Sequence, residues 1–316
     1  MIRPAPLTLF LTRDQPATVQ RLDRDRQLHR VRPGVYARVN DWAALAPWER
    51  YLARVHAVAR TWVDPVFCLE SSAALRGMPT FGEPRLVHLL SADGSTWHEG
   101  DVAVHGLRDG RRTTRAEGIR LTSAVDTALD LCRVLPPAFA LAVADALLRS
   151  QPVGQPPIDL SAGGRAQLNR RGLRQLDWVQ ARATRLAESV GESVSRAVIE
   201  WLRCEEPEFQ AEFRFEGRTD RAGFFWGRRG VIGESDGYGK YDADNVAAAR
   251  SHFVDEKRRE DRLRRNVGPV IRWDWSDTMH WRNLLAKLRA GGLVPVRPMN
   301  TAMLEMLSEH PRSLPR

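Results

Sequence analysis

The chain of 316 residues carries 48 lysines and arginines against 39 aspartates and glutamates, a formal net charge of +9 at pH 7. This length is too great for one small domain and predicts two or three units, each with a core of its own. The sequence lacks a run of about eighteen apolar residues and a signal-peptide core, which excludes a membrane-spanning protein and predicts a cytoplasmic one.

The first 62 residues predict a helix followed by a basic β-hairpin. The helical pattern begins with a capping-box sequence at Thr12, and residues 28–38 then form two strands around a turn at Pro33 and Gly34. This order is typical of a reduced winged helix, whose hairpin arginines contact DNA phosphates. The arginines expected to do so are Arg30, Arg32 and Arg38. The alternative is a hairpin that only packs on the helix after it.

Residues 63–150 predict an α+β body without a catalytic constellation. Together with the helix at residues 48–62, the expected elements are a helix at 71–79, strands at 85–90, 101–106 and 118–122, and helices at 124–135 and 137–149. His88, His98 and His105 lack the spacing of a zinc pair and are interpreted as structural. The cysteines Cys68, Cys132 and Cys204 are predicted to be buried free thiols.

The proline- and glycine-rich residues 151–164 predict a linker, followed by a second domain over 165–300 and a tail over 301–316. An amphipathic pattern from Leu168 to Leu186 predicts a long helix at the start of this domain. Further helices and strands are expected in the order αβββαβα, the last helix beginning near Asp277. The chain is therefore expected to be of the α/β or α+β class.

The central motif of the second domain is an apolar strand that runs into Glu234, Ser235 and Asp236. Because side chains alternate along a strand, Glu234 and Asp236 project from one face, where two carboxylates repel each other unless a cation or proton lies between them. Oxygen ligands of this kind favour Mg²⁺ or Mn²⁺. The alternative is a strand end followed by a turn.

Five short motifs occur in an order that resembles the Vsr-like branch of the PD-(D/E)XK nuclease fold. They are GES at 191–193, GFFW at 223–226, GESDG at 233–237 with Lys240 following, EKRREDRL at 256–263 and VIRWDW at 270–275. Together with RPGVY at 32–36 and SSAALRGMP at 71–79, they resemble actinobacterial AbiEi-type antitoxins of type IV toxin–antitoxin systems. The resemblance implies DNA binding and a cognate toxin protein as partner.

The resemblance also implies a metal site for phosphodiester hydrolysis. Glu192 would join Glu234 and Asp236 as a ligand, and Lys240 would stabilise developing charge. A capping role at the start of a helix explains Glu192 equally well. In the family pattern Asp-Phe-x-Trp an aspartate opens the second motif, whereas Gly223 stands there in this chain.

The nearest acid to Gly223 is Asp220, three residues upstream. This odd offset is about 10 Å along a strand and directs the side chain to the opposite face. Asp220 completes a metal site only if a bulge or a register change returns it to Glu234. The sequence therefore predicts a catalytically weakened site.

The charged helix after the acidic motif has two interpretations. In the first, it contacts DNA phosphates through the basic residues Lys257, Arg258, Arg259 and Arg262. In the second, pairs at i,i+4 spacing such as Asp261 and Arg265 satisfy one another on a solvated face.

Three functions remain open from the sequence. The leading hypothesis is a DNA-binding regulator of the antitoxin kind, which represses an operon or counters a toxin. The second is a Mg²⁺-dependent DNA endonuclease. The third is a protein-interaction scaffold whose positive charge reflects only the coding bias of a GC-rich genome, because lysine supplies just three of the 48 basic residues. Steep salt dependence of DNA binding distinguishes the first two from the third.

Overall fold

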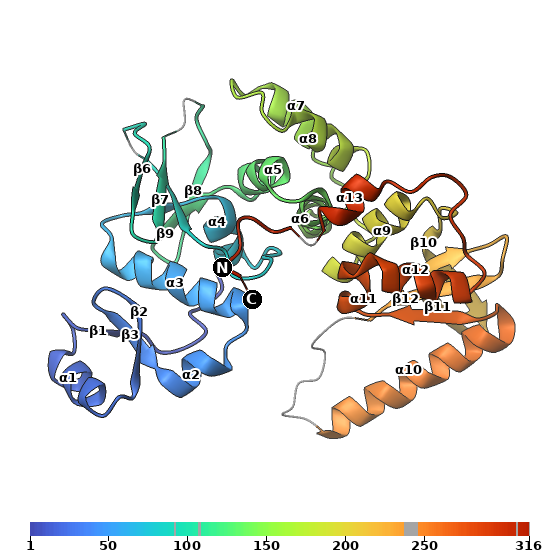
Figure 1. The fold of residues 1–316 in the computed structure, drawn as a ribbon, viewed down its shortest axis with the longest axis horizontal. Helices are drawn as coiled ribbons and strands as arrows, with labels where there is room; N and C mark the ends of the chain where they lie inside the picture. The colour runs from blue at the N-terminus through green and yellow to red at the C-terminus, as the bar shows by residue number, and fades with distance from the viewer. Residues whose placement is uncertain (92, 107–108, 237–245, 308, 316) are drawn as a thin grey trace. The chain divides into compact units, whose positions relative to one another are not determined.

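The computed structural model describes residues 1–91, 93–106, 109–236, 246–307 and 309–315 (Figure 1). Within these residues the protein is a mixed α/β structure with thirteen helices and three sheets. No described helix combines the length and the apolar surface that a membrane span requires.

The chain forms two compact units, and the second is inserted into the first. Unit 1 comprises Met1–Arg182 together with Pro311–Arg316, and unit 2 comprises Ala183–His310. The expected linker at residues 151–164 lies inside unit 1, because α7 (Leu160–Arg165) and α8 (Leu173–Gln180) pack on the helices before it. The boundary therefore lies at 182/183, and the last residues return to unit 1 instead of forming a separate tail.

Unit 1 begins with a three-stranded sheet of order β1-β3-β2. Its elements are β1 (Phe10–Leu11), α1 (Pro16–Arg24), β2 (Leu28–Arg32) and β3 (Val35–Arg38). Gly34 has φ +76°, a left-handed conformation that suits glycine in the hairpin turn. Leu11 and Val35 share an apolar cluster with Ala57, so the hairpin packs on α3 (Pro47–Thr61). The predicted helix and hairpin are present, and β1 adds a strand that the sequence did not indicate.

A six-stranded sheet of order β6-β7-β5-β4-β9-β8 forms the centre of unit 1. Its strands are β4 (Val66–Phe67), β5 (Val87–Leu90), β6 (Trp97–Glu99), β7 (Val102–His105), β8 (Thr113–Ala116) and β9 (Ile119–Thr122). The pairs β5–β7 and β4–β9 are parallel, whereas the other pairs are antiparallel. Three of these strands were predicted, and β4, β6 and β8 were not.

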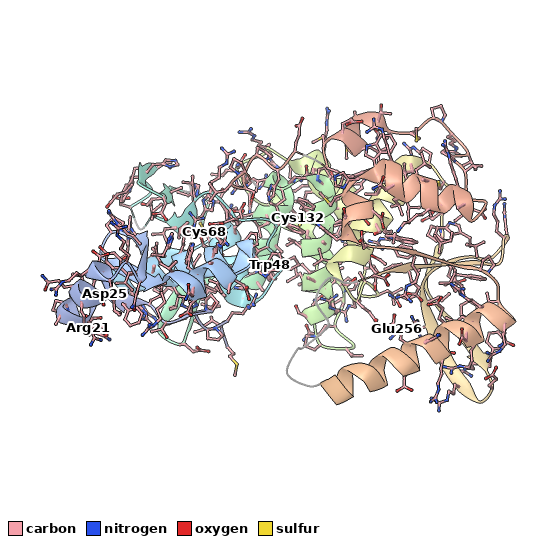
Figure 2. All side chains as sticks on the ribbon, turned by 60° about the horizontal axis from the view of Figure 1, so that its bottom comes forward. Arg21, Asp25, Trp48, Cys68, Cys132 and Glu256 are labelled. Atoms are coloured by element: carbon pink, nitrogen blue, oxygen red, sulfur yellow. The ribbon has the colours of Figure 1, made fainter. Side chains whose placement is uncertain are left out.

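Helices complete the core of unit 1. They are α2 (Val39–Ala44), α3 (Pro47–Thr61), α4 (Leu69–Arg76), α5 (Ala124–Val134) and α6 (Pro137–Ser150). Cys68 and Cys132 are buried free thiols in this unit (Figure 2), and Cys204 is buried in unit 2, which confirms the prediction.

The long helix predicted from Leu168 to Leu186 is wrong. These two leucines are 71% and 52% exposed, and α8 spans only residues 173–180. Gly172 precedes α8 with φ +78°, and a Cβ there would lie 2.8 Å from the backbone oxygen of Arg133. A left-handed residue in close contact with a neighbouring helix ends any continuous helix at this point.

Unit 2 is a four-stranded sheet of order β10-β11-β12-β13 with helices on both faces (Figure 1). Its strands are β10 (Glu208–Phe215), β11 (Arg218–Trp226), β12 (Val231–Ser235) and β13 (Val270–Trp273). Its helices are α9 (Val190–Leu202), α10 (Val246–Asn266), α11 (Trp275–Met279), α12 (Trp281–Ala290) and α13 (Thr301–Glu305). The strands β10 to β12 pair antiparallel, whereas β12 and β13 are parallel. The elements thus follow in the predicted order, with α11 preceding the expected last helix.

Candidate functional site

The candidate site lies between the sheet of unit 2 and helix α10. Ile232 of β12 shares an apolar cluster with Leu263 of α10, and Glu234, two residues further along β12, forms an ion pair with Arg259 of the same helix. On the other face of the sheet, Gly233 fits beneath Trp226 and Trp273, since a Cβ there would lie within 2.8 Å of both rings. The tight packing around Gly233 fixes which face of β12 carries Glu234.

Glu234 is a mostly buried carboxylate with an arginine beside it. Its side chain is 15% exposed, and its Oε1 lies 3.1 Å from Nη2 of Arg259. This oxygen is shielded from solvent, and the contact does not meet hydrogen-bond geometry. Burial raises the pKa of Glu234; the positive charges of Arg259 and Arg272 oppose that shift, and the negative charge of Glu192 reinforces it.

Asp236 is held by Arg272 of β13. Nε of Arg272 donates to both carboxylate oxygens of Asp236 at 3.1 Å, and Nη2 makes a further contact. The same guanidinium donates to Glu256 at 2.7 Å and Glu260 at 2.8 Å, both on α10 (Glu256 is labelled in Figure 2). Hydrogen bonds to Asp236 and to the two glutamates raise the pKa of Arg272. One arginine therefore holds three acids together between β12, β13 and α10.

Asp220 also faces α10, although alternation along β11 predicted the opposite face from Gly223. Asp220 is 6% exposed and accepts hydrogen bonds from Nε and Nη2 of Arg262 at 2.9 and 2.7 Å. The pleat changes face near Gly223: Ala222 belongs to the apolar cluster beneath α10, whereas Phe224 packs on Trp273.

The pairing register does not shift where the pleat changes face. The pairs Phe209–Phe224 and Ala211–Ala222 continue on either side, and Gln210 between them has φ +59°. A left-handed residue of β10 thus lies beside the point where the side-chain alternation of β11 is interrupted. Asp220 comes to the α10 side, but its carboxylate is used by Arg262.

Gly223 marks the position where the resemblance places an aspartate. A Cβ at this residue would lie 3.6 Å from Oε2 of Glu234, an ordinary van der Waals contact, and Gly223 is not in the left-handed region. The backbone therefore tolerates a side chain here and would direct it toward Glu234.

Glu192 lies in the first turn of α9, where Ser189 caps the helix by accepting from its amide at 3.1 Å. The carboxylate of Glu192 accepts from the amide of Glu188 at 2.8 Å and from Nε2 of Gln210 at 2.9 Å. Burial raises the pKa of Glu192. Glu192 thus takes part in the hydrogen bonds at the start of α9, and its charge also raises the pKa of Glu234.

The four basic residues of α10 that the sequence assigned to phosphate contacts divide into two sets. Lys257 and Arg258 are exposed, whereas Arg259 and Arg262 turn inward to Glu234 and Asp220. The sequence paired Arg265 with Asp261 at i,i+4 spacing. In the structure Arg265 forms an ion pair with Glu216 instead, at 2.9 Å. Helix α10 is therefore fastened to the sheet by arginines instead of presenting all four to phosphates. Lys240 lies outside the described residues.

The amino-terminal hairpin presents basic side chains that form no ion pair with a described acid. Arg30 and Arg38 are exposed. Nε and Nη1 of Arg32 are shielded from solvent and donate to no described acceptor. Arg21 and Arg24 are exposed in the last turn of α1 and were not singled out from the sequence (Figure 2 labels Arg21). Their i,i+3 spacing on the helix was the available signal.

The described residues do not fit a divalent ion in this conformation, because the carboxylates of Asp220, Glu234 and Asp236 each hold a guanidinium group. Among the residues described, no cluster of three or more His, Cys, Asp or Glu side chains is arranged to hold a metal. Comparisons with protein-family models, curated proteins and solved structures give no match to this chain.

Proposed function

We propose that this protein is a DNA-binding regulator of the type IV antitoxin kind, in which unit 2 retains a nuclease-type fold without hydrolysing DNA. Three observations support the proposal: the motif resemblance, the αβββαβα order of unit 2 and the net charge of +9. In this proposal the partners are DNA and a cognate toxin protein. Unit 1 supplies the reduced winged helix, and unit 2 has the PD-(D/E)XK architecture.

The observation that carries the proposal is the pairing of three of the four candidate acids with arginines. Asp220 pairs with Arg262, and Glu234 pairs with Arg259. Asp236 shares Arg272 with two glutamates. A guanidinium stays charged at any physiological pH, so it competes permanently with a metal ion for these oxygens. Ion pairing of this kind supports a binding and scaffolding use of the fold.

The surface proposed for DNA is the hairpin of unit 1. Arg30 and Arg38 are exposed, and Arg32 has guanidinium donors without a described acceptor. Phosphate oxygens accept such donors, and each neutralised phosphate releases counterions. On α10, Lys257 and Arg258 are exposed and are candidates for further phosphate contacts.

One observation favours the second candidate, a metal-dependent endonuclease. Oε1 of Glu234 is buried without a well-formed hydrogen bond, and the charge of Glu192 acts on the same carboxylate. A rearrangement that released Arg259 would free the carboxylate of Glu234 for a metal ion. Cleavage of DNA that depends on Glu234 is the property that separates this candidate from the first.

The proposal is tested by anisotropy titrations of a labelled DNA duplex between about 50 and 200 mM salt. The double variant Arg30→Ala/Arg38→Ala should weaken binding and reduce the slope of log K against log salt by about 2, since each phosphate contact contributes about 0.9. The matched control, Arg174→Ala/Arg297→Ala, removes the same charge from exposed positions outside the hairpin. Equal losses of DNA affinity in both double variants would contradict the proposed interface, and so would an affinity that does not change with salt concentration.

A further inference from the structure

The last residues of the chain lie along unit 1 as an extended strap. Ser313 forms an antiparallel bridge with Pro84. The amide of Arg85 donates to the carbonyl of Arg312 at 2.8 Å, and the amide of Leu314 donates to the carbonyl of Glu83 at 2.7 Å. The chain thus adds a short strand to the segment that precedes β5.

The side chain of Arg312 enters a buried polar pocket. Its Nη2 donates to Oε2 of Glu70 at 2.7 Å, and its Nε contacts Oε1 of the same carboxylate. Glu70, in the first turn of α4, is only 3% exposed. Nη2 of Arg312 also lies 3.3 Å from Nε2 of His88 on β5. The guanidinium of Arg312 therefore contacts a carboxylate on α4 and an imidazole on β5.

Hydrogen bonds within unit 1 hold the walls of this pocket. Nδ1 of His88 lies 2.9 Å from Nε2 of His105, and the backbone amide of His88 donates to Oγ of Ser71 at 2.7 Å. Oγ of Ser71 lies 2.8 Å from the hydroxyl of Tyr51. These contacts do not involve Arg312, so the pocket has a framework of its own. His88 and His105, two of the three histidines that the sequence marked as structural, therefore belong to an arginine-binding pocket.

The strap contributes little apolar surface to the core. Pro311, Leu314 and Pro315 are exposed, and Ser313 is buried through its polar contacts with Glu83. Attachment through backbone hydrogen bonds and one charged side chain is the chemistry of reversible peptide docking by strand addition. A segment that completed the core would instead bury apolar side chains.

We propose that unit 1 carries a docking groove for an extended, arginine-containing peptide, and that its occupant is the protein's own residues 311–315. Because the chain leaves unit 1 at residue 182 and returns at residue 311, the docked strap gives unit 2 a second attachment to unit 1. The strap is a reversible clasp, with Arg312 as its anchor and Glu70 as the group that recognises the guanidinium.

The test uses the full chain with Arg312→Glu, which places a carboxylate against Glu70 and opens the clasp. A labelled peptide of residues 309–316 should bind this variant at least about tenfold more tightly than the wild-type chain, whose own strap competes at a high effective concentration. The same peptide with glutamine at the arginine position, and the double variant Glu70→Gln/Arg312→Glu, should show no binding. A natively folded Arg312→Glu chain that fails to bind the peptide would overturn the proposal.

Hydrogen exchange of the wild-type chain supplies a second test that needs no variant. If the clasp opens separately, the amides of Arg85 and Leu314 exchange at least about tenfold faster than the ladder amide of Leu89 in β5. If these amides exchange only together with Leu89 at the rate of global unfolding, the strap is an integral part of the core and the clasp does not exist.

Discussion

Replacement of Gly223 by aspartate would restore a carboxylate at the position where the resemblance expects one. A Cβ at residue 223 lies 3.6 Å from Oε2 of Glu234 without a backbone conformation that opposes it. The new carboxylate would therefore face Glu234, a residue whose pKa burial already raises. Gly223→Asn is the matched control, because it adds nearly the same volume without the charge.

The expected cost follows from Coulomb's law. Two unit charges about 4 Å apart repel by about 4 kcal/mol at an effective dielectric constant of about 20. Arg259, at 3.1 Å from Glu234, offsets part of this repulsion, and uptake of a proton limits the remainder. We expect Gly223→Asp to be less stable than Gly223→Asn by about 2 kcal/mol at neutral pH.

Urea unfolding of both variants, with and without Mn²⁺, measures this effect. A metal that enters between the carboxylates at a hundredfold excess over its Kd would add about 2.7 kcal/mol to the aspartate variant alone. Equal stability of the two variants, with no response of either to Mn²⁺, would refute the inference that residue 223 faces Glu234 in a former metal site.

Three further predictions concern unit 1. Arg312→Ala removes the guanidinium that pairs with the buried carboxylate of Glu70 and should lower the free energy of unfolding by about 3 kcal/mol in urea titrations. The exposed-residue control Arg24→Ala should change it by less than about 0.5 kcal/mol. Burial lowers the pKa of His88 from 6.5 to about 4, so the unfolded chain binds more protons than the folded chain between these pH values. The free energy of unfolding should therefore fall by up to about 3 kcal/mol as the pH falls through this window. The variant His88→Gln should lose less stability over the same pH range. Burial raises the pKa of the Cys68 and Cys132 thiols, so iodoacetamide at pH 8 should modify them only after unfolding, as peptide mass analysis would show.

Periodic patterns predicted some local elements of this fold well. Helix α3 and strand β12 coincide with segments whose apolar spacing the sequence displays directly. The two-residue strand β4 is too short to show any period, although it lies centrally in its sheet. The break before α8 depends on contact between Gly172 and Arg133, which no local pattern contains.

The candidate site also depends on contacts between residues far apart in the sequence, which local patterns do not predict. Alternation along β12 predicted that Glu234 projects from a defined face, but not that Arg259 would neutralise it across 25 residues of sequence. The change of face near Gly223 lies beside a left-handed Gln210 on the neighbouring strand, and the alternation of β11 alone did not reveal it. The contact between Arg312 and Glu70 joins residues 242 positions apart, and only the tertiary fold creates it.

The most direct test of the central claim is a single incubation of supercoiled plasmid with the purified protein and Mn²⁺, analysed before and after removal of protein. The proposal predicts plasmid that is retarded at low salt, because the protein binds DNA. After deproteinisation the plasmid should be fully supercoiled, because three of the four acids of the candidate site are paired with arginines. Nicked or linear plasmid produced by the wild-type chain, and lost with Glu234→Ala, would contradict the claim and show that unit 2 is an active nuclease.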